Sequence, residues 1–145
     1  MIRLVDPAAS HALGVRLAQV VRPGDVITLA GPLGAGKTSI ARGLLEALGV
    51  EGEAPSPSFA IVQPYDPPEV RLPVLHVDLY RLEDSRELVE LGLDEMRADS
   101  LLIVEWPERG GDWSNALALN LTIEPDGARA LTARVPPAWE GRWQT

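Results

Sequence analysis

The sequence has no cysteine, only one lysine and only two histidines among its 145 residues. The absence of cysteine excludes disulfides, thiolate nucleophiles and cysteine-ligated zinc. The histidines, His11 and His76, are too few for a typical zinc cluster, so we expect any metal to be held by oxygen ligands. No run approaches the roughly 18 apolar residues of a membrane span, and the N-terminus does not resemble a signal peptide. We therefore expect a cytoplasmic protein with no membrane partner.

Positive charge is also scarce, since the chain has 13 lysines and arginines against 21 acidic residues, a formal net charge of −8. The basic residues are scattered along the sequence rather than gathered into one run. Such a chain repels a polyanion, which argues against autonomous binding to nucleic acid. A role near RNA would therefore need a partner.

The size and composition predict a single domain, residues 1–145. Hydrophobic residues make up 46% of the chain, enough to bury one sizeable core.

The first part of the chain alternates helix and strand signals. Asp6 followed by Pro7 is a good helix start, and 26–30 is a short apolar run typical of a buried strand. Apolar residues at helical spacing then predict a helix that ends at Gly49. The later expected elements are strands at 59–62, 74–78 and 101–104 and a short helix at 85–91.

The C-terminal part has a different pattern. Residues 117–123 alternate apolar and polar, Pro125-Asp126-Gly127 forms a turn signal, and 130–135 can return as the partner strand. The fold class predicted is α/β: a P-loop NTPase-like sheet with flanking helices and a C-terminal antiparallel hairpin. Whether residues 136–145 pack on the body or stay mobile is left open.

Residues 31–38 read Gly-Pro-Leu-Gly-Ala-Gly-Lys-Thr, which fits the Walker A pattern between a predicted strand and a predicted helix. Glycines let the backbone wrap phosphate oxygens, and the N–H groups at the helix start supply a positive field. Lys37, the only lysine, is expected to reach the β and γ phosphates of ATP, and the Thr38 hydroxyl to ligate Mg²⁺. We expect Lys37 to lie at the surface, so that Lys37→Ala would leave the fold intact.

Two carboxylates, Asp78 and Glu105, each end an apolar strand. Open α/β sheets bind ligands at this end of their strands, and a phosphate-bound Mg²⁺ usually needs a carboxylate there. One carboxylate is expected to hold the metal and the other to orient the attacking water. The sequence does not decide which does which.

Other residues carry weaker signals. His76 is more typical of a structural histidine than of a ligand, and Trp106 of a core residue or pocket wall. Arg81 and Arg86 are candidate arginine fingers, but surface arginines are common.

Several further segments resemble the bacterial TsaE (YjeE) family of ATPases. The most restrictive are His-x-Asp-Leu-Tyr-Arg, at 76–81, and Glu-Trp-Pro, at 105–107. The matching segments are 24–26, 33–38, 56–59, 76–82, 90–92 and 105–107. The chain departs mildly from the family pattern at Pro32, Ser39 and Ser58.

The resemblance implies a protein that binds ATP and Mg²⁺, associates with the TsaB and TsaD subunits, and hydrolyses ATP for the threonylcarbamoyladenosine modification of tRNA. Chemistry on tRNA would belong to the partner. Carried over by position, Thr38 and Glu105 would ligate Mg²⁺, while Lys37, Asp78 and Glu105 would serve catalysis. Residues 56–59 would form a switch-like loop. The nucleotide-binding set would be Gly31, Leu33, Gly34, Ala35, Gly36, Lys37, Thr38 and Ser39, bordered by Pro7, Pro107 and Gly127.

Three alternatives were weighed against this interpretation. A GTPase would need Asn-Lys-x-Asp and Asp-x-x-Gly segments, and neither occurs. A small-molecule kinase would need an acceptor pocket and an arginine-bearing lid, for which the chain has little room. A nucleotide-gated assembly module with incidental hydrolysis overlaps the favoured function and stays open. Because no arginine finger can be assigned, we expect hydrolysis to be slow without partners.

Overall fold

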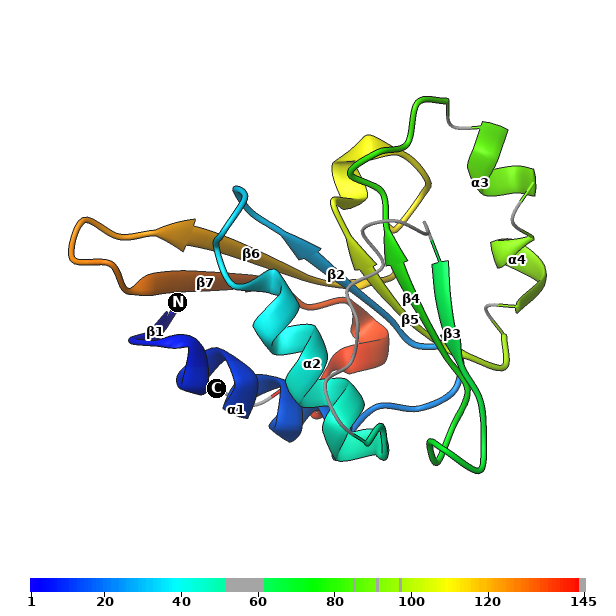
Figure 1. Ribbon diagram of the computed structural model, residues 1–145, viewed down its shortest axis with the longest axis horizontal. Coiled ribbons are helices and arrows are strands. Elements are labelled where there is room, and N and C mark those ends of the chain that lie inside the picture. The colour runs from blue at the N-terminus through cyan, green and yellow to red at the C-terminus, as the bar shows by residue number, and fades with distance from the viewer. Residues whose placement is uncertain (52–61, 85, 91, 97, 144–145) are drawn as a thin grey trace.

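A computed structural model describes residues 1–51, 62–84, 86–90, 92–96 and 98–143. In this part of the chain the strands form one seven-stranded sheet in the order β1-β7-β6-β2-β5-β4-β3 (Figure 1). Strands β6, β2, β5 and β4 are parallel, and β3, β7 and β1 pair antiparallel with their neighbours. The strands are β1 Ile2–Leu4, β2 Val26–Ala30, β3 Val62–Tyr65, β4 Val74–Asp78, β5 Leu101–Glu105, β6 Leu117–Ile123 and β7 Arg129–Arg134. This is the predicted α/β fold class, with its C-terminal hairpin.

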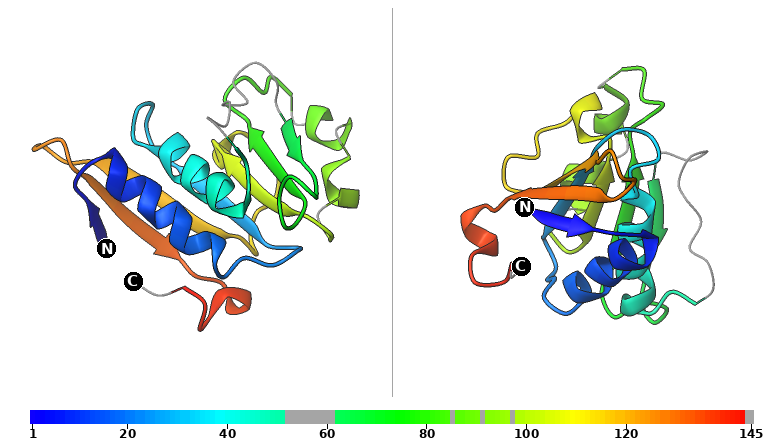
Figure 2. Two further views of the ribbon diagram at one scale, coloured as in Figure 1. Left: turned by 60° about the horizontal axis from the view of Figure 1, so that its bottom comes forward. Right: turned by 90° about the vertical axis from the view of Figure 1, so that its left-hand side faces the viewer.

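Helices cover the two faces of the sheet unequally. The long helices α1 (Pro7–Ala18) and α2 (Lys37–Leu48) lie side by side over one face, as Figure 2 shows. The opposite face packs a smaller apolar cluster that includes Leu88 of α3 (Arg86–Glu90) and Leu93 of α4 (Leu93–Met96). Two short 3₁₀ helices, η1 (Pro107–Arg109) and η2 (Pro137–Trp139), follow β5 and β7.

Two glycines allow α1 and α2 to pack closely. A Cβ placed on Gly14 would lie 2.1 Å from the Ile40 carbonyl oxygen, and one on Gly43 would lie 2.1 Å from the His11 carbonyl oxygen. The helices therefore meet backbone to backbone at these points. This contact fixes where α2 begins relative to the sheet, and the predicted phosphate loop leads into α2.

Local signals predicted most elements correctly. Asp6 caps α1 by accepting a hydrogen bond from the Ala9 N–H at 2.9 Å, and Pro7 occupies the first helical position. The expected helix at 85–91 corresponds to α3, although residues 85 and 91 lie outside the described ranges. The strand expected at 59–62 is displaced, since β3 runs over Val62–Tyr65 and residues 59–61 lie outside the description. Pro64 is compatible with β3 because β3 is an edge strand.

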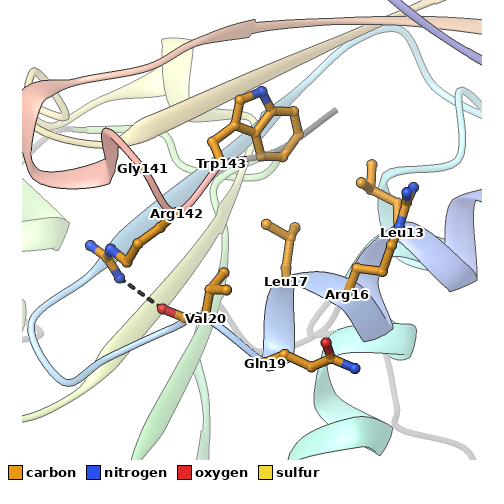
Figure 3. A pocket seen from close by; sticks show the side chains of 8 residues that line it. All are labelled: Leu13, Arg16, Leu17, Gln19, Val20, Gly141, Arg142 and Trp143. Atoms are coloured by element: carbon orange, nitrogen blue, oxygen red, sulfur yellow. Dashed lines mark hydrogen bonds between the residues drawn. The ribbon is translucent and has the colours of Figure 1, made fainter.

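Within the described residues, the C-terminal segment 136–143 packs back on the body, one of the two alternatives left open by the sequence. Trp139 is 1% exposed and belongs to the main core. Arg142 donates hydrogen bonds to both carboxylate oxygens of Asp25, at 2.6 and 3.0 Å. It also donates to the Val20 carbonyl at 2.9 Å (Figure 3). Trp143 and the end of α1 line a pocket of about 360 Å³. None of the helices in the described ranges has the length and apolar character that crossing a bilayer requires.

Candidate functional site

The loop between β2 and α2 has the backbone of an anion cradle. Gly31, Gly34 and Gly36 all have positive φ angles, +146°, +81° and +99°. The position of a Cβ on Gly34 would have no atom within 4 Å, so the loop is open on that side. Gly36 caps α2 without any side-chain hydrogen bond. The N–H groups of the first helical turn are therefore available to an anion, as a phosphate site requires.

Lys37 is buried, so the expectation of a surface lysine is wrong. Its side chain leaves only 5% of the residue exposed, because Nζ donates to the Gly31 carbonyl at 2.6 Å and lies 3.4 Å from the centroid of the Trp106 ring. Burial lowers the pKa of the Lys37 ammonium, and nearby carboxylates, with Glu105 the strongest, oppose this shift. Lys37→Ala would leave a space in this packing and is not a neutral test of the loop.

Trp106 holds an unusual backbone conformation directly after β5. Its φ of +59° is the one positive value found at a non-glycine position in the described residues. A left-handed non-glycine residue costs about 1–3 kcal/mol, and such strain clusters at functional sites. The conformation brings the ring over Lys37, where a cation–π contact offsets part of this cost. Trp106 is thus a wall of the site, one of the two roles predicted for it, and Pro107 follows it as the first residue of η1.

The strand register brings the predicted carboxylates together. Asp78 is paired with Glu105 across the parallel strands β4 and β5, at their carboxyl ends. Because β5 also pairs with β2, Glu105 lies one strand from the phosphate loop and Asp78 two strands away. The Thr38 hydroxyl donates to Glu105 Oε1 at 3.4 Å. Glu105 and Thr38 therefore form the pair closest to the expected metal position.

His76 completes this group, which the sequence did not predict. Its Nε2 lies 2.7 Å from Glu105 Oε2, and the two residues are only 1% and 2% exposed. The buried Nδ1 has no hydrogen-bond partner among the described residues. A neutral ring with its proton on Nε2 satisfies the carboxylate and leaves only a bare acceptor unpaired, so we assign this tautomer. One signal in the sequence could have indicated this contact: His76 and Asp78 are two positions apart on one strand and therefore lie on the same face of the sheet.

Asp78 has a pKa above that of an ordinary aspartate. Burial is the main cause, and the negative charge of Glu105 adds to it. The Tyr80 N–H, which donates to Asp78 Oδ1 at 2.9 Å, opposes the shift, as does the positive charge of Lys37. Asp78 accepts a proton more readily than a solvated aspartate does, which suits a group that handles water.

The donor set fits a magnesium ion bound together with phosphate. The described residues contain no cluster of three or more histidine, cysteine or carboxylate side chains that would hold a metal alone. Thr38 and Glu105 offer two oxygen ligands beside the loop. Mg²⁺ usually takes one or two protein oxygens and fills its remaining positions with water and substrate phosphate oxygens.

A cavity of about 240 Å³ adjoins the phosphate loop on the side away from the carboxylates. Pro7 and Gly127, both predicted to border the nucleotide, line it together with Gly34, Gly36 and Ser39. Leu33, at the loop tip, is 74% exposed, whereas Ala35 is fully buried. Pro107 lies instead beside Trp106. The predicted switch loop, 56–59, is outside the described residues.

The two candidate arginine fingers, Arg81 and Arg86, are both exposed, whereas Lys37 of the phosphate loop is buried. Arg86 is bonded to Asp84, the carboxylate two positions before it, in an exposed local pair. Arg81 is exposed at the turn after β4.

Fold and loop together define the chain as an α/β protein with a P-loop between a buried strand and a helix. The model of the family described as "Threonylcarbamoyl adenosine biosynthesis protein TsaE" matches residues 4–132. The chain belongs to the TsaE family.

Curated relatives named tRNA threonylcarbamoyladenosine biosynthesis protein TsaE are similar over much of the chain. The protein of Streptomyces coelicolor is 46% identical over 97 residues, which cover 66% of each chain. That of Bacillus subtilis is 42% identical over 105 residues, covering 72% of this chain and 64% of the relative. That of Mycobacterium leprae is 42% identical over 120 residues, covering 78% and 74%. The match thus spans slightly less than two thirds of the first two relatives.

A solved structure is similar as well. The crystal structure of Bacillus subtilis YdiB superposes with a TM-score of 0.73 at 32% identity, covering 91% of this chain and 82% of that one. The two chains therefore share their fold over most of their length.

Proposed function

We propose that this chain is a Mg²⁺-dependent ATPase that acts with TsaB and TsaD in making threonylcarbamoyladenosine in tRNA. The observation that carries the proposal is the convergence of Lys37, Thr38 and the His76–Glu105 pair on one glycine-rich loop. The family's name supplies the pathway, and the activity and the partners are our inference. With its net charge of −8, the chain would meet tRNA only through its partners, in the cytoplasm.

The loop and Lys37 would bind the phosphates. The N–H groups at the start of α2 would donate hydrogen bonds to the β phosphate, while Lys37 exchanges the Gly31 carbonyl and the Trp106 ring for phosphate oxygens. A phosphate oxygen is a stronger partner for an ammonium than a carbonyl or a ring face. Binding would therefore release Trp106 from its contact with Lys37.

The two carboxylates would have separate roles, Glu105 in binding the metal and Asp78 in activating water. Thr38 and Glu105 would hold Mg²⁺, which when bound neutralises charge that develops on the phosphates. His76 would fix one Glu105 oxygen so that the other faces Thr38. Asp78, with its raised pKa, would orient the attacking water and take up its proton.

The test is phosphate release from Mg·ATP by the purified chain, alone and with a preformed TsaB–TsaD complex. We expect slow release alone, an increase on titrating in the complex, and loss of release in Glu105→Gln. Glu140→Gln, an exposed carboxylate on the C-terminal segment, is the matched control and should behave as wild type. No release above background in either condition would refute the ATPase assignment.

A nucleotide-gated assembly module is the second candidate, and one observation favours it. The apolar side chains of Leu33 and Tyr80 are exposed beside the nucleotide edge, where a partner could sense the bound state. Tyr80 also contacts Trp106, with ring centroids 4.9 Å apart and ring planes tilted by 47°. ATP-dependent capture of TsaB–TsaD that is complete in Glu105→Gln would favour this function over obligate hydrolysis.

A further inference from the structure

A single arginine connects the C-terminal hairpin to the phosphate loop. Arg129, the first residue of β7, donates from Nε to the Ala35 carbonyl at 3.2 Å and from Nη2 to the Gly34 carbonyl at 3.1 Å. Its Nη1 also donates to the Gly127 carbonyl in the hairpin turn. One guanidinium therefore ties together segments that lie about 94 residues apart in sequence.

These contacts set the direction of the loop's N–H groups. In a trans peptide the carbonyl and the N–H point in opposite directions. Holding the Gly34 and Ala35 carbonyls against Arg129 therefore turns the N–H groups of Ala35 and Gly36 away from it. The Ala35 N–H closes the loop by donating to the Pro32 carbonyl at 3.1 Å. The Gly36 N–H donates to no backbone carbonyl in the described part of the chain and is free for an anion.

The loop gains more from such a brace than an ordinary loop would. Glycines in left-handed conformations are also free to leave them, because glycine has more backbone conformations to lose when it is ordered than any other residue. A guanidinium is suited to this task, because its planar donors are fixed relative to one another and cannot be deprotonated. Lysine offers a single flexible ammonium and cannot hold two carbonyls in a fixed relation.

We propose that Arg129 is a positioning residue that braces the phosphate loop through the Gly34 and Ala35 carbonyls and so preorganises its N–H groups for phosphate. The inference rests on the proposed nucleotide binding and deepens it. It assigns a role in the loop to the hairpin, which contains none of the Walker A residues. Arg129 acts through the loop backbone rather than by touching the reacting atoms.

The first test measures binding by calorimetry, with ADP and with inorganic pyrophosphate as probes. Arg129→Met and Arg129→Lys should both weaken the two probes about tenfold, because each removes the planar fork. Arg134→Met, at the other end of β7, should bind as wild type. Binding by Arg129→Lys at wild-type strength would show that charge alone matters and would overturn the brace.

The second test uses no nucleotide and so separates the two proposals. Hydrogen exchange at the Ala35 amide, which closes the loop on the Pro32 carbonyl, should be about tenfold faster in Arg129→Met than in Arg134→Met, as expected when a local restraint is lost. Equal exchange in the two variants would refute the brace. If wild type binds neither probe while the Ala35 amide responds as expected, the proposed function fails and the brace stands.

Discussion

The α1–α2 interface and the phosphate edge of the sheet both depend on glycine, but for different reasons. At the interface, Gly14 and Gly43 have ordinary helical backbones and are needed because a Cβ would enter the facing backbone at 2.1 Å. At the phosphate edge, Gly34 has open space around it and is needed for its φ of +81°. The first region uses glycine for close packing and the second for backbone direction.

The same contrast holds for polar groups. The main core against α1 and α2 is built mostly of leucine, with valine, isoleucine and alanine, whereas the phosphate edge buries Lys37, His76 and Glu105. Burying charged groups costs desolvation free energy, and the contacts that these groups make in the interior do not fully offset that cost. We therefore expect substitutions at the interface to lower stability most, and substitutions at the phosphate edge to lower binding more than stability.

The largest loss of stability is expected from Gly43→Ala. The new methyl group would overlap the His11 carbonyl and force the helices apart, which should cost about 3 kcal/mol or more. For a chain of this length that lowers the Tm by roughly 10 °C. Thermal unfolding followed by circular dichroism measures it.

Helix propensity works in the opposite direction, which makes this prediction strict. Alanine favours a helix over glycine by about 1 kcal/mol, so Gly43→Ala on an isolated helix would stabilise. The control is Ala47→Gly, at an exposed position of α2, which should cost about that amount. A Gly43→Ala protein as stable as wild type would mean that the helices do not meet as closely as described.

The second effect in size is the coupling between His76 and Glu105. His76→Phe should destabilise the protein, because it removes the donor to Glu105 Oε2 and leaves that buried oxygen unpaired. Adding Glu105→Met should recover much of the loss, which corresponds to a coupling free energy of about 2 kcal/mol in a double-mutant cycle. Additive effects of the two substitutions would show that the contact contributes nothing to the fold.

The sequence predicted those parts of the site that depend on local pattern. The loop lies where the strand, the glycines and the helix predicted it, and parallel pairing of two apolar strands brought Asp78 and Glu105 together. Both inferences need only the chain direction and the usual register of an α/β sheet. Neither inference depends on a specific contact between side chains that are distant in sequence.

The parts that were missed depend on distant contacts. Lys37 is buried because Trp106 adopts a left-handed backbone conformation, which no propensity favours. His76 reaches Glu105 across neighbouring strands, and Arg129 reaches the loop from the last hairpin. Strand β1 has three residues, too few for an alternation to be recognised.

A smaller loss of stability is expected at Gly34. Gly34→Ala meets no neighbouring atom, so its cost is the left-handed φ alone, about 1–2 kcal/mol. Binding should suffer more, with the affinity for Mg·ATP lowered about tenfold or further, because the N–H groups no longer point into the loop. Calorimetry beside thermal unfolding separates the two effects. If Gly34→Ala lowered the Tm as much as Gly43→Ala, the contrast between the two regions would be lost.

The smallest effect has the opposite sign and concerns Asp78. Its pKa is raised above the ordinary value of 3.8, so at pH values between that figure and the folded pKa the native state binds more protons than the unfolded state. The stability contributed by the protonated carboxyl is therefore lost as the pH rises through this window, and above it the charged side chain is a cost. The asparagine of Asp78→Asn stays neutral at every pH. Its free energy of unfolding should therefore equal that of wild type at the acidic end and exceed it by a small amount, which becomes constant, as the pH rises.

Asp126→Asn is the matched control, because the pKa of Asp126 is lowered by the Ala128 N–H and by Arg3. That carboxylate contributes stability above its unfolded pKa and loses it as the pH falls, so the asparagine variant should become worse, not better, as the pH rises. Unfolding of wild type and both variants without nucleotide, from about pH 3.5 to 7.5, gives the two differences. If both variants gave the same sign, Asp78 would not be a half-buried carboxylate whose charged form is destabilised. If the two stability differences have opposite signs and phosphate release is impaired only in Asp78→Asn, the Asp78 carboxylate lowers stability while it serves hydrolysis.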